Sequence, residues 1–226
     1  AKKLRALLRL VRPGFRHYAR ENAHVRDAAR ALSSARDVKV AADTLVALMA
    51  WAGREAPPIR LATEPGEEEA GLAAFADAMQ QMLARTARWK TGRIDRDTLA
   101  EGLAHTYRRG LVAMERALAA PSDTAFHEWR KHTKYHWNQI GLCAACAEDI
   151  LPSAHKAAGD LASLLGLHHD IAMLRDKLAA DSGVFGDIDT GFVLEAAARR
   201  QRELEAAIAG LGRQVYAETP KAFRAR

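Results

Sequence analysis

The sequence predicts an all-α fold, and three observations support that prediction. Hydrophobic residues make up 49% of the 226 residues but aromatic residues only 6%. The core is therefore expected to consist mainly of Ala, Leu and Val, a composition that favours closely packed helices. Apolar and charged residues recur at helical spacing along most of the chain. No segment alternates convincingly between apolar and polar residues, as a half-buried strand would.

The first part of the chain predicts three helices. Residues 1–12 form a helix whose basic face carries Lys2, Arg5, Arg9 and Arg12 and whose apolar face carries Leu4, Leu7, Leu8 and Val11. Pro13 and Gly14 end this helix. Residues 15–32 form the next helix, with a core stripe of Tyr18, Val25 and Leu32, and Ser33-Ser34 breaks it. Ser34-x-x-Asp37 resembles a capping box that opens a third helix reaching about residue 51.

The remaining elements follow from the same patterns. The acidic segment 53–71, rich in Pro and Gly, is expected to be an exposed loop. Helical patterns resume over 68–90 and 95–119, and the second of these has a core stripe of Leu103, Tyr107, Leu111, Met114 and Leu118. After Pro121 we expect helices over 123–146, 150–165, 168–181 and 191–210, followed by a short tail.

One stretch of the 123–146 helix, FHEWRKHTKYHWNQI at residues 126–140, concentrates cations, histidines and tryptophans. Helical geometry places His127, Arg130, Lys131, Lys134 and Asn138 on one side and Trp129, Thr133, His136, Ile140 and Cys143 on the other. Ser122 and Asp123 supply an N-cap. Because His132 and His136 lie away from the basic stripe, we expect them to be packing residues.

The chain contains an internal repeat. Aligning residues 32–45 with 164–178 pairs Asp37 with Asp170, Val38 with Ile171, Asp43 with Asp176 and Leu45 with Leu178. With one residue of slippage upstream, Lys2 pairs with Lys134. Two such units, 1–119 and 120–226, imply two helical bundles related by a pseudo-two-fold axis, with the two basic helices facing each other across a shared groove.

The net charge limits the classes of binding partner to expect, and the cysteines indicate the redox compartment. Lys+Arg number 34 and Asp+Glu 28, a net charge of +6, which favours an anionic partner such as nucleic acid, acidic lipid or polyphosphate. No apolar run approaches ~18 residues, so no membrane span is expected. Cys143 and Cys146 form a C-x-x-C inside a helical pattern and are interpreted as core residues of a protein in the reducing cytoplasm.

The motifs together resemble those of one known family. HEWRKHTK (127–134) followed by LLGLHHDIAML (164–174) is similar to the second half of a CHAD domain, the conserved-histidine α-helical domain. KKLRALLRLVRP (2–13) with LSSARDV (32–38) is similar to its first half, and LGRQVYAETPKAF (211–223) to its C-terminus. The resemblance implies a single domain of two four-helix bundles that binds inorganic polyphosphate along a central basic surface. It also implies association with polyphosphate granules and no catalysis. The family's first H-x-x-R would fall about seven residues before Lys2, so the first half of the site is expected to lack that turn.

We therefore expect polyphosphate to be bound by the basic stripes and their extensions. The candidate residues are Lys2, Lys3, Arg5, Arg9, Arg12, Arg16, Arg20, Arg30, Arg108, Arg109, His127, Arg130, Lys131, Lys134, Lys156 and His169. Polyphosphate is a flexible polyanion, and Lys and Arg side chains spread along a groove suit it better than one deep pocket does. His127 can donate a hydrogen bond to phosphate, or it can hydrogen-bond a neighbouring helix and orient Arg130, and both interpretations stay open. Several of the arginines, and Lys156, can instead pair with Asp27, Asp37 or Asp160.

Two alternatives remain. His168-His169-Asp170 resembles the His-Asp pair of metal-dependent HD-type phosphohydrolases, but its repeat partner Arg36-Asp37 cannot bind a metal in the same way. Non-specific nucleic-acid binding through the tryptophans is the other alternative, and it is weaker because no reader motif is evident. No Walker A and no G-x-G-x-x-G sequence is present, so no cofactor is expected.

Overall fold

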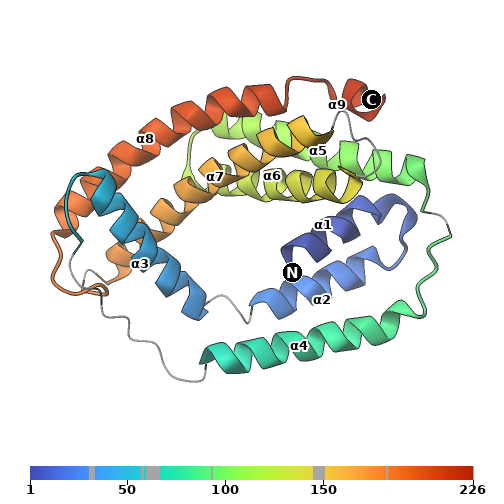
Figure 1. Ribbon diagram of the computed structural model, residues 1–226, viewed down its shortest axis with the longest axis horizontal. Coiled ribbons are helices and arrows are strands. Elements are labelled where there is room, and N and C mark those ends of the chain that lie inside the picture. Colours follow the sequence, from blue (N-terminus) through green and yellow to red (C-terminus); the bar gives the residue numbers. More distant parts are fainter. Residues whose placement is uncertain are drawn as a thin grey trace.

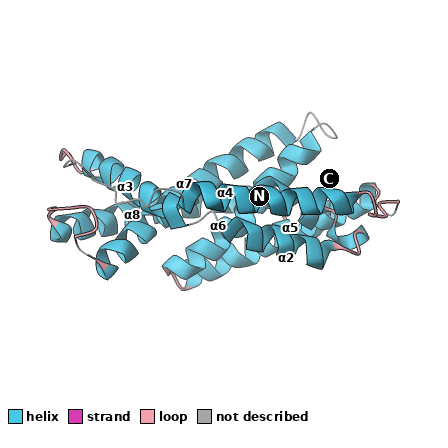
Figure 2. Cartoon of the chain, turned by 90° about the horizontal axis from the view of Figure 1, so that it is seen from below, coloured by secondary structure: helices cyan, strands magenta, loops and turns pink. Residues whose placement is uncertain are grey.

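The computed structural model describes residues 1–30, 34–56, 59, 67–92, 94–144, 151–181 and 183–225. The helices in these residues are α1 (Lys2–Leu10), a 3-10 turn η1 (Arg12–Gly14), α2 (Tyr18–Arg30), α3 (Ser34–Trp51), α4 (Glu67–Thr86), α5 (Arg96–Ala119), α6 (Asp123–Cys143), α7 (Leu151–Ala180), α8 (Thr190–Val215) and α9 (Pro220–Ala225). No strand occurs in this part of the chain (Figure 2), so the all-α prediction is confirmed. None of the described helices combines the length and apolar composition needed to cross a lipid bilayer.

The buried apolar residues fall into two clusters. The larger one joins α3, α5, α6, α7 and α8, with Trp129 and Tyr107 among its largest side chains. The smaller one, built from Leu8, Phe15, Val25 and Met82, joins α1, α2 and α4. In Figure 1, α4 runs along one edge of the molecule beside α2, and α8 runs along the opposite edge. Since α4 packs mainly on α2, this helix depends on the smaller cluster.

The two basic helices pack directly on each other. The Gln139 side chain of α6 donates a hydrogen bond to the Ala6 carbonyl of α1 at 3.1 Å. On its other side, α1 crosses α5 at Gly102, where a Cβ would overlap the Leu10 carbonyl. Short contacts with both α5 and α6 therefore fix the position of α1, which carries much of the basic stripe.

A buried ion pair attaches α4 to α2. The carboxylate of Glu21 is completely buried and accepts two hydrogen bonds from Arg85 of α4, at 3.1 and 2.7 Å. Arg20 donates to the same carboxylate at 2.7 Å. Burial alone would raise the pKa of Glu21, but these arginines hold it below its usual value. The charged form of Glu21 therefore stabilises the contact between α2 and α4.

Several predicted boundaries are wrong. Separate helices are expected over 150–165 and 168–181, but one continuous helix, α7, spans Leu151–Ala180. Gly166 disfavours a helix by only about 1 kcal/mol, and Leu165 and Ile171 on either side are buried in the larger cluster. The expected tail contains helix α9, whose Phe223 stacks on Tyr107 at 4.1 Å. Packing thus extends helices that local sequence signals would end.

The remaining differences are local. The expected helix over 15–32 begins at Tyr18, after the 3-10 turn η1. Leu7, placed on the apolar face of the first helix, is 40% exposed, whereas Ala6, Leu8 and Leu10 are buried. Leu32, Ser33 and Cys146 lie outside the described residues, as do residues 57, 58 and 60–66 of the expected loop 53–71, whose last five residues belong to α4.

Candidate anion-binding surface

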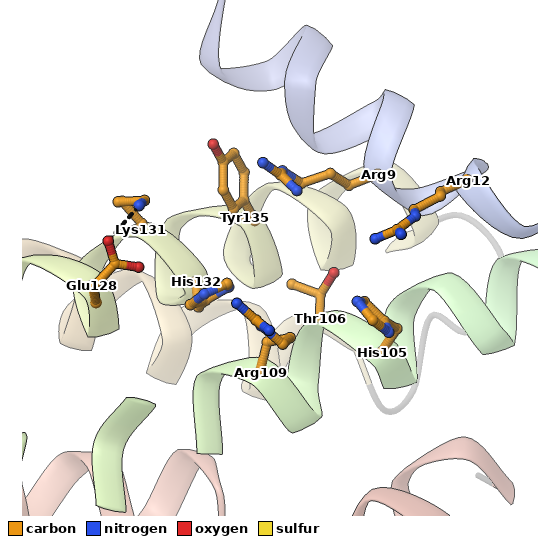
Figure 3. Close-up of a pocket in the computed structure, with 9 residues that line it drawn as sticks. All are labelled: Arg9, Arg12, His105, Thr106, Arg109, Glu128, Lys131, His132 and Tyr135. Carbon is orange, nitrogen blue, oxygen red and sulfur yellow. Dashed lines mark hydrogen bonds and ion pairs between the residues drawn. The ribbon is translucent and has the colours of Figure 1, made fainter. Parts of the chain in front are cut away.

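The basic helices α1 and α6 line a cleft with α5, which we call the anion cleft (Figure 3). Its cationic lining is Arg9 of α1, Arg12 of η1, Arg109 of α5 and Lys131 of α6. His105, Thr106, Glu128, His132 and Tyr135 complete it. The cleft has a volume of about 350 Å³, enough room for a multiply charged phosphate group.

A second depression, which we call the basic groove, lies on the other side of Tyr135. It consists of two adjoining hollows that share Lys2, Val40, Arg130 and Asp170, and its further basic residues are Lys3, Arg5, Lys134 and His169. Tyr135 lines both the basic groove and the anion cleft. Cations from α1 and α6 therefore extend continuously from one depression to the other.

Neutral groups hold the arginines of the first basic stripe. The Arg9 guanidinium lies over the Tyr135 ring, 4.3 Å from its centroid, and donates to the Tyr18 hydroxyl at 2.9 Å. Arg12 lies over the Tyr18 ring at 5.0 Å, and Arg5 donates to the Asn22 amide oxygen at 3.2 Å. Among the described residues, no carboxylate forms an ion pair with these three arginines. Their positive charge is oriented but not neutralised.

Two histidines meet at the edge of the basic groove. The Nδ1 atoms of His127 and His169 are 3.3 Å apart, so one ring donates a hydrogen bond to the other. Burial, followed by the nearby Arg130, lowers the pKa of His127 and lowers that of His169 to about 4. Both rings are therefore neutral at pH 7. His127 contacts the helix opposite, as one of its two sequence readings expected.

Acidic residues are few on this surface. Glu128 pairs with Lys131 at 2.6 Å in the anion cleft. Asp37 and Asp170, partners in the internal repeat, both line the basic groove. Val40 and Met173, which the same alignment pairs, line it as well. Positions of α3 and α7 that the sequence alignment pairs thus line one hollow.

The structure brings together only part of the candidate set. Lys2, Lys3, Arg5, Arg9, Arg12, Arg109, Arg130, Lys131, Lys134 and His169 line the two depressions, and His127 joins them through His169. The other candidates line neither depression. Arg20 contacts Glu21, Arg30 contacts Asp27, Lys156 contacts Asp160, Arg16 contacts His17, and Arg108 is exposed on α5.

Sequence reasoning missed five residues that line the anion cleft, namely His105, Thr106, Glu128, His132 and Tyr135. His132 was expected to be a packing residue, and this is wrong, because its ring lies between Arg109 and Lys131 in the cleft (Figure 3). His105, Thr106 and Tyr135 were not considered. A usable signal existed for His105, which lies four residues before Arg109 and so on the same face of α5. His136 is buried at 2% exposure, as expected.

The residues of the phosphohydrolase alternative point to different partners. His168 is buried against Phe126, and its Nε2 lies 3.2 Å from a Glu205 carboxylate oxygen. His169 instead contacts His127, and Asp170 lines the basic groove. In the described part of the chain, no three His, Cys, Asp or Glu side chains are grouped so that they could hold a metal ion. These three neighbours in sequence do not converge on one point.

Comparison with known proteins identifies one family. The family model described as CHAD domain matches residues 1–179. The matched range includes both basic helices and every residue that lines the anion cleft and the basic groove. It ends before residues 211–223, where a resemblance was also noted. No curated protein and no solved structure matches the chain.

Proposed function

This chain belongs to the CHAD domain family, and from that premise we propose that it binds inorganic polyphosphate along the anion cleft and the basic groove. The observation that carries the proposal is the arrangement of Arg5, Arg9 and Arg12, which neutral partners hold in place with their charge uncompensated. An arginine without a carboxylate partner remains available to an incoming phosphate.

The dimensions of the surface suit a flexible polyanion. Arg5 and Arg9 are one helical turn apart, which separates them by about 6 Å along α1. Lys131 and Lys134 repeat this spacing approximately on α6. A chain of linked phosphates can contact successive cations of either helix and cross from one depression to the other at Tyr135. Each contact releases a counterion, which adds a salt-dependent contribution to binding.

The internal repeat supports a symmetric architecture. We propose two bundles related by a pseudo-two-fold axis, with α1 and α6 as the equivalent basic helices on either side of the shared surface. The pairs Asp37–Asp170 and Val40–Met173 that line one groove support this. A polyanion has no intrinsic direction, so equivalent cations from both repeats can serve one chain.

The proposed role of the protein is to bind polyphosphate without chemical change. We propose that the protein holds polyphosphate at polyphosphate granules and does not cleave it. Nucleic acid is the weaker candidate ligand because Trp129 is fully buried and Trp137 stacks on His155 at 5.6 Å, which leaves neither as a free platform for a base.

A competition titration tests the proposal. Long-chain polyphosphate, single-stranded DNA and RNA are compared at equal total charge and at several salt concentrations, and the polyphosphate is afterwards run on a gel. We expect polyphosphate to bind most tightly, since its phosphates are spaced more closely, and to stay at full length. Equal or tighter binding of DNA would favour the nucleic-acid alternative. Shortening of the chain in the presence of Mn²⁺ would favour the phosphohydrolase.

A further inference from the structure

Two histidines of the anion cleft have no role in the proposal so far. His105 lies on α5, one turn before Arg109, and His132 lies on α6 beside Lys131. Figure 3 shows both rings among the guanidinium groups that line the cleft. His105 is exposed and His132 is half-buried. Each ring can therefore be reached by a ligand that enters the cleft.

The charged groups around these rings are predominantly cationic. α1 contributes Arg9, η1 contributes Arg12, α5 contributes Arg108 and Arg109, and α6 contributes Glu128, Lys131 and Tyr135. Two carboxylates lie nearby: Glu128 is already bound to Lys131 at 2.6 Å, and Glu101, one turn before His105 on α5, lines an adjoining hollow with Arg9, Arg12 and His105. The field at both rings therefore opposes a further positive charge in the free protein.

This environment keeps both histidines neutral. Burial, followed by the charge of Arg109, lowers the pKa of His132 to about 4. Partial burial, followed by Arg12, Arg108 and Arg109, lowers the pKa of His105. At pH 7 each ring then has one N–H donor and one bare nitrogen. A bare nitrogen facing a phosphate oxygen would be repelled.

We propose that the anion cleft binds phosphate together with protons, so that His105 and His132 become imidazolium ions as the phosphate group enters. The inference rests on the proposed function and adds its regulation by pH. The incoming phosphate brings the negative charge that the free cleft lacks. Each ring takes one proton from the solvent onto its bare nitrogen and then has two N–H donors for the ligand. No bond in the ligand is broken.

The coupling has a calculable size. If binding restores an ordinary histidine pKa of about 6.5, the His132 ring, which is neutral at pH 6 in the free protein, becomes about three-quarters protonated in the complex. His132 then strengthens binding by about fourfold between pH 8 and pH 6. It takes up about 0.75 proton per occupied cleft at pH 6 and almost none at pH 8, and His105, whose pKa is also lowered in the free protein, adds to this uptake.

Calorimetry in buffers of different ionisation enthalpy measures this proton uptake directly. Long-chain polyphosphate is titrated at pH 6 and pH 8 into the wild type, the double variant His105→Gln/His132→Gln, and the control His155→Gln. His155 lies on α7 and lines neither depression. The proton equilibria of the ligand and of His127 and His169 are common to all three proteins, so they cancel in the comparison.

We expect wild type and control to take up at least about 0.75 proton more than the double variant at pH 6, with no difference at pH 8. Equal uptake by all three proteins, with polyphosphate still bound, would overturn the inference and leave the proposed function intact. Absence of polyphosphate binding to the wild type would instead overturn the proposed function.

A second measurement does not depend on the variant folding. Imidazole NMR of the wild type follows the titration of His132 with and without inorganic tripolyphosphate. We expect the pKa of His132 to rise from about 4 by at least two units on saturation. A value unchanged by saturating tripolyphosphate would refute proton coupling at this residue.

Discussion

Replacing Arg5, Arg9 and Arg12 together by Gln should weaken polyphosphate binding by on the order of a hundredfold near 0.1 M salt. A charge pair at about 4 Å contributes ~1 kcal/mol in a water-like dielectric. The structure holds these three arginines by neutral partners, so no ion pair with a carboxylate has to be broken before they bind a phosphate. Three contacts amount to about 3 kcal/mol, and about 1.4 kcal/mol corresponds to tenfold in affinity.

The same variant should change the salt dependence. Each phosphate contact on a flexible single chain contributes about 0.7 to the slope of log affinity against log salt. Loss of three contacts should therefore flatten the slope by about 2. Fluorescence anisotropy with labelled polyphosphate over a series of salt concentrations measures affinity and slope together. Circular dichroism and urea unfolding establish that the variant keeps its fold, because Arg9 also packs on Tyr135.

A matched control removes the same charge elsewhere. Arg202, Arg213 and Lys221 are exposed and line neither depression, and replacing all three by Gln lowers the net charge equally. At a separation of about 20 Å a charge is worth only ~0.2 kcal/mol in water, and salt at 0.1 M screens it further. The control should therefore bind within about twofold of the wild type. If both triple variants lost affinity equally, the net charge and not this surface would determine binding.

Three further predictions concern stability. Glu21→Gln leaves Arg85 without its buried carboxylate and should lower the free energy of unfolding by about 2–3 kcal/mol. This is less than the usual cost of breaking a fully buried ion pair, because Arg85 is partly exposed. An unchanged urea midpoint would contradict this prediction. Burial lowers the pKa of His136 to about 3, whereas the pKa of a histidine in the unfolded chain is about 6.5. The free energy of unfolding is therefore fully maintained above about pH 6.5 and falls as the pH is lowered from there towards 3, by up to about 1.4 kcal/mol per pH unit. His136→Leu should make the urea midpoint less sensitive to acid over that range, and an identical pH profile would refute the assignment. Gly102→Ala should displace α1, because its Cβ would overlap the Leu10 carbonyl, and should lower both the melting temperature and polyphosphate affinity. The control Gly210→Ala, whose Cβ meets nothing, should leave the affinity unchanged and raise the melting temperature slightly, since Ala favours a helix interior over Gly by about 1 kcal/mol.

Local sequence patterns predicted the core side of α6 well. Trp129 and Ile140 are fully buried, as their helical spacing indicated. Ser122 caps α6 by accepting a hydrogen bond from the Ala125 amide, as its position before the helix indicated. These features depend on residues within one or two turns of each other, and helical periodicity reports such relations directly.

The features that sequence reasoning missed depend on contacts between distant residues. Arg109 and His132 meet only because α5 and α6 pack side by side, and Arg9 reaches them because α1 crosses at Gly102. The continuity of α7 through Gly166 likewise depends on the core that surrounds Leu165 and Ile171. A single sequence predicts which face of a helix is basic. Which other helix packs against that face depends on the tertiary structure.

The position of Arg9 affects the entropy of binding. The rotamer entropy of an arginine side chain amounts to about 2 kcal/mol. An exposed arginine would lose part of this entropy when it binds a ligand. Here the Tyr135 ring and the Tyr18 hydroxyl already restrict the side chain in the ligand-free protein. Part of the side-chain entropy of Arg9 is therefore lost on folding, before any phosphate binds. The conformational entropy lost on association then comes mainly from the flexible ligand and from the lysine side chains that line the two depressions. The arginines, already ordered, are fixed points of contact for a mobile chain.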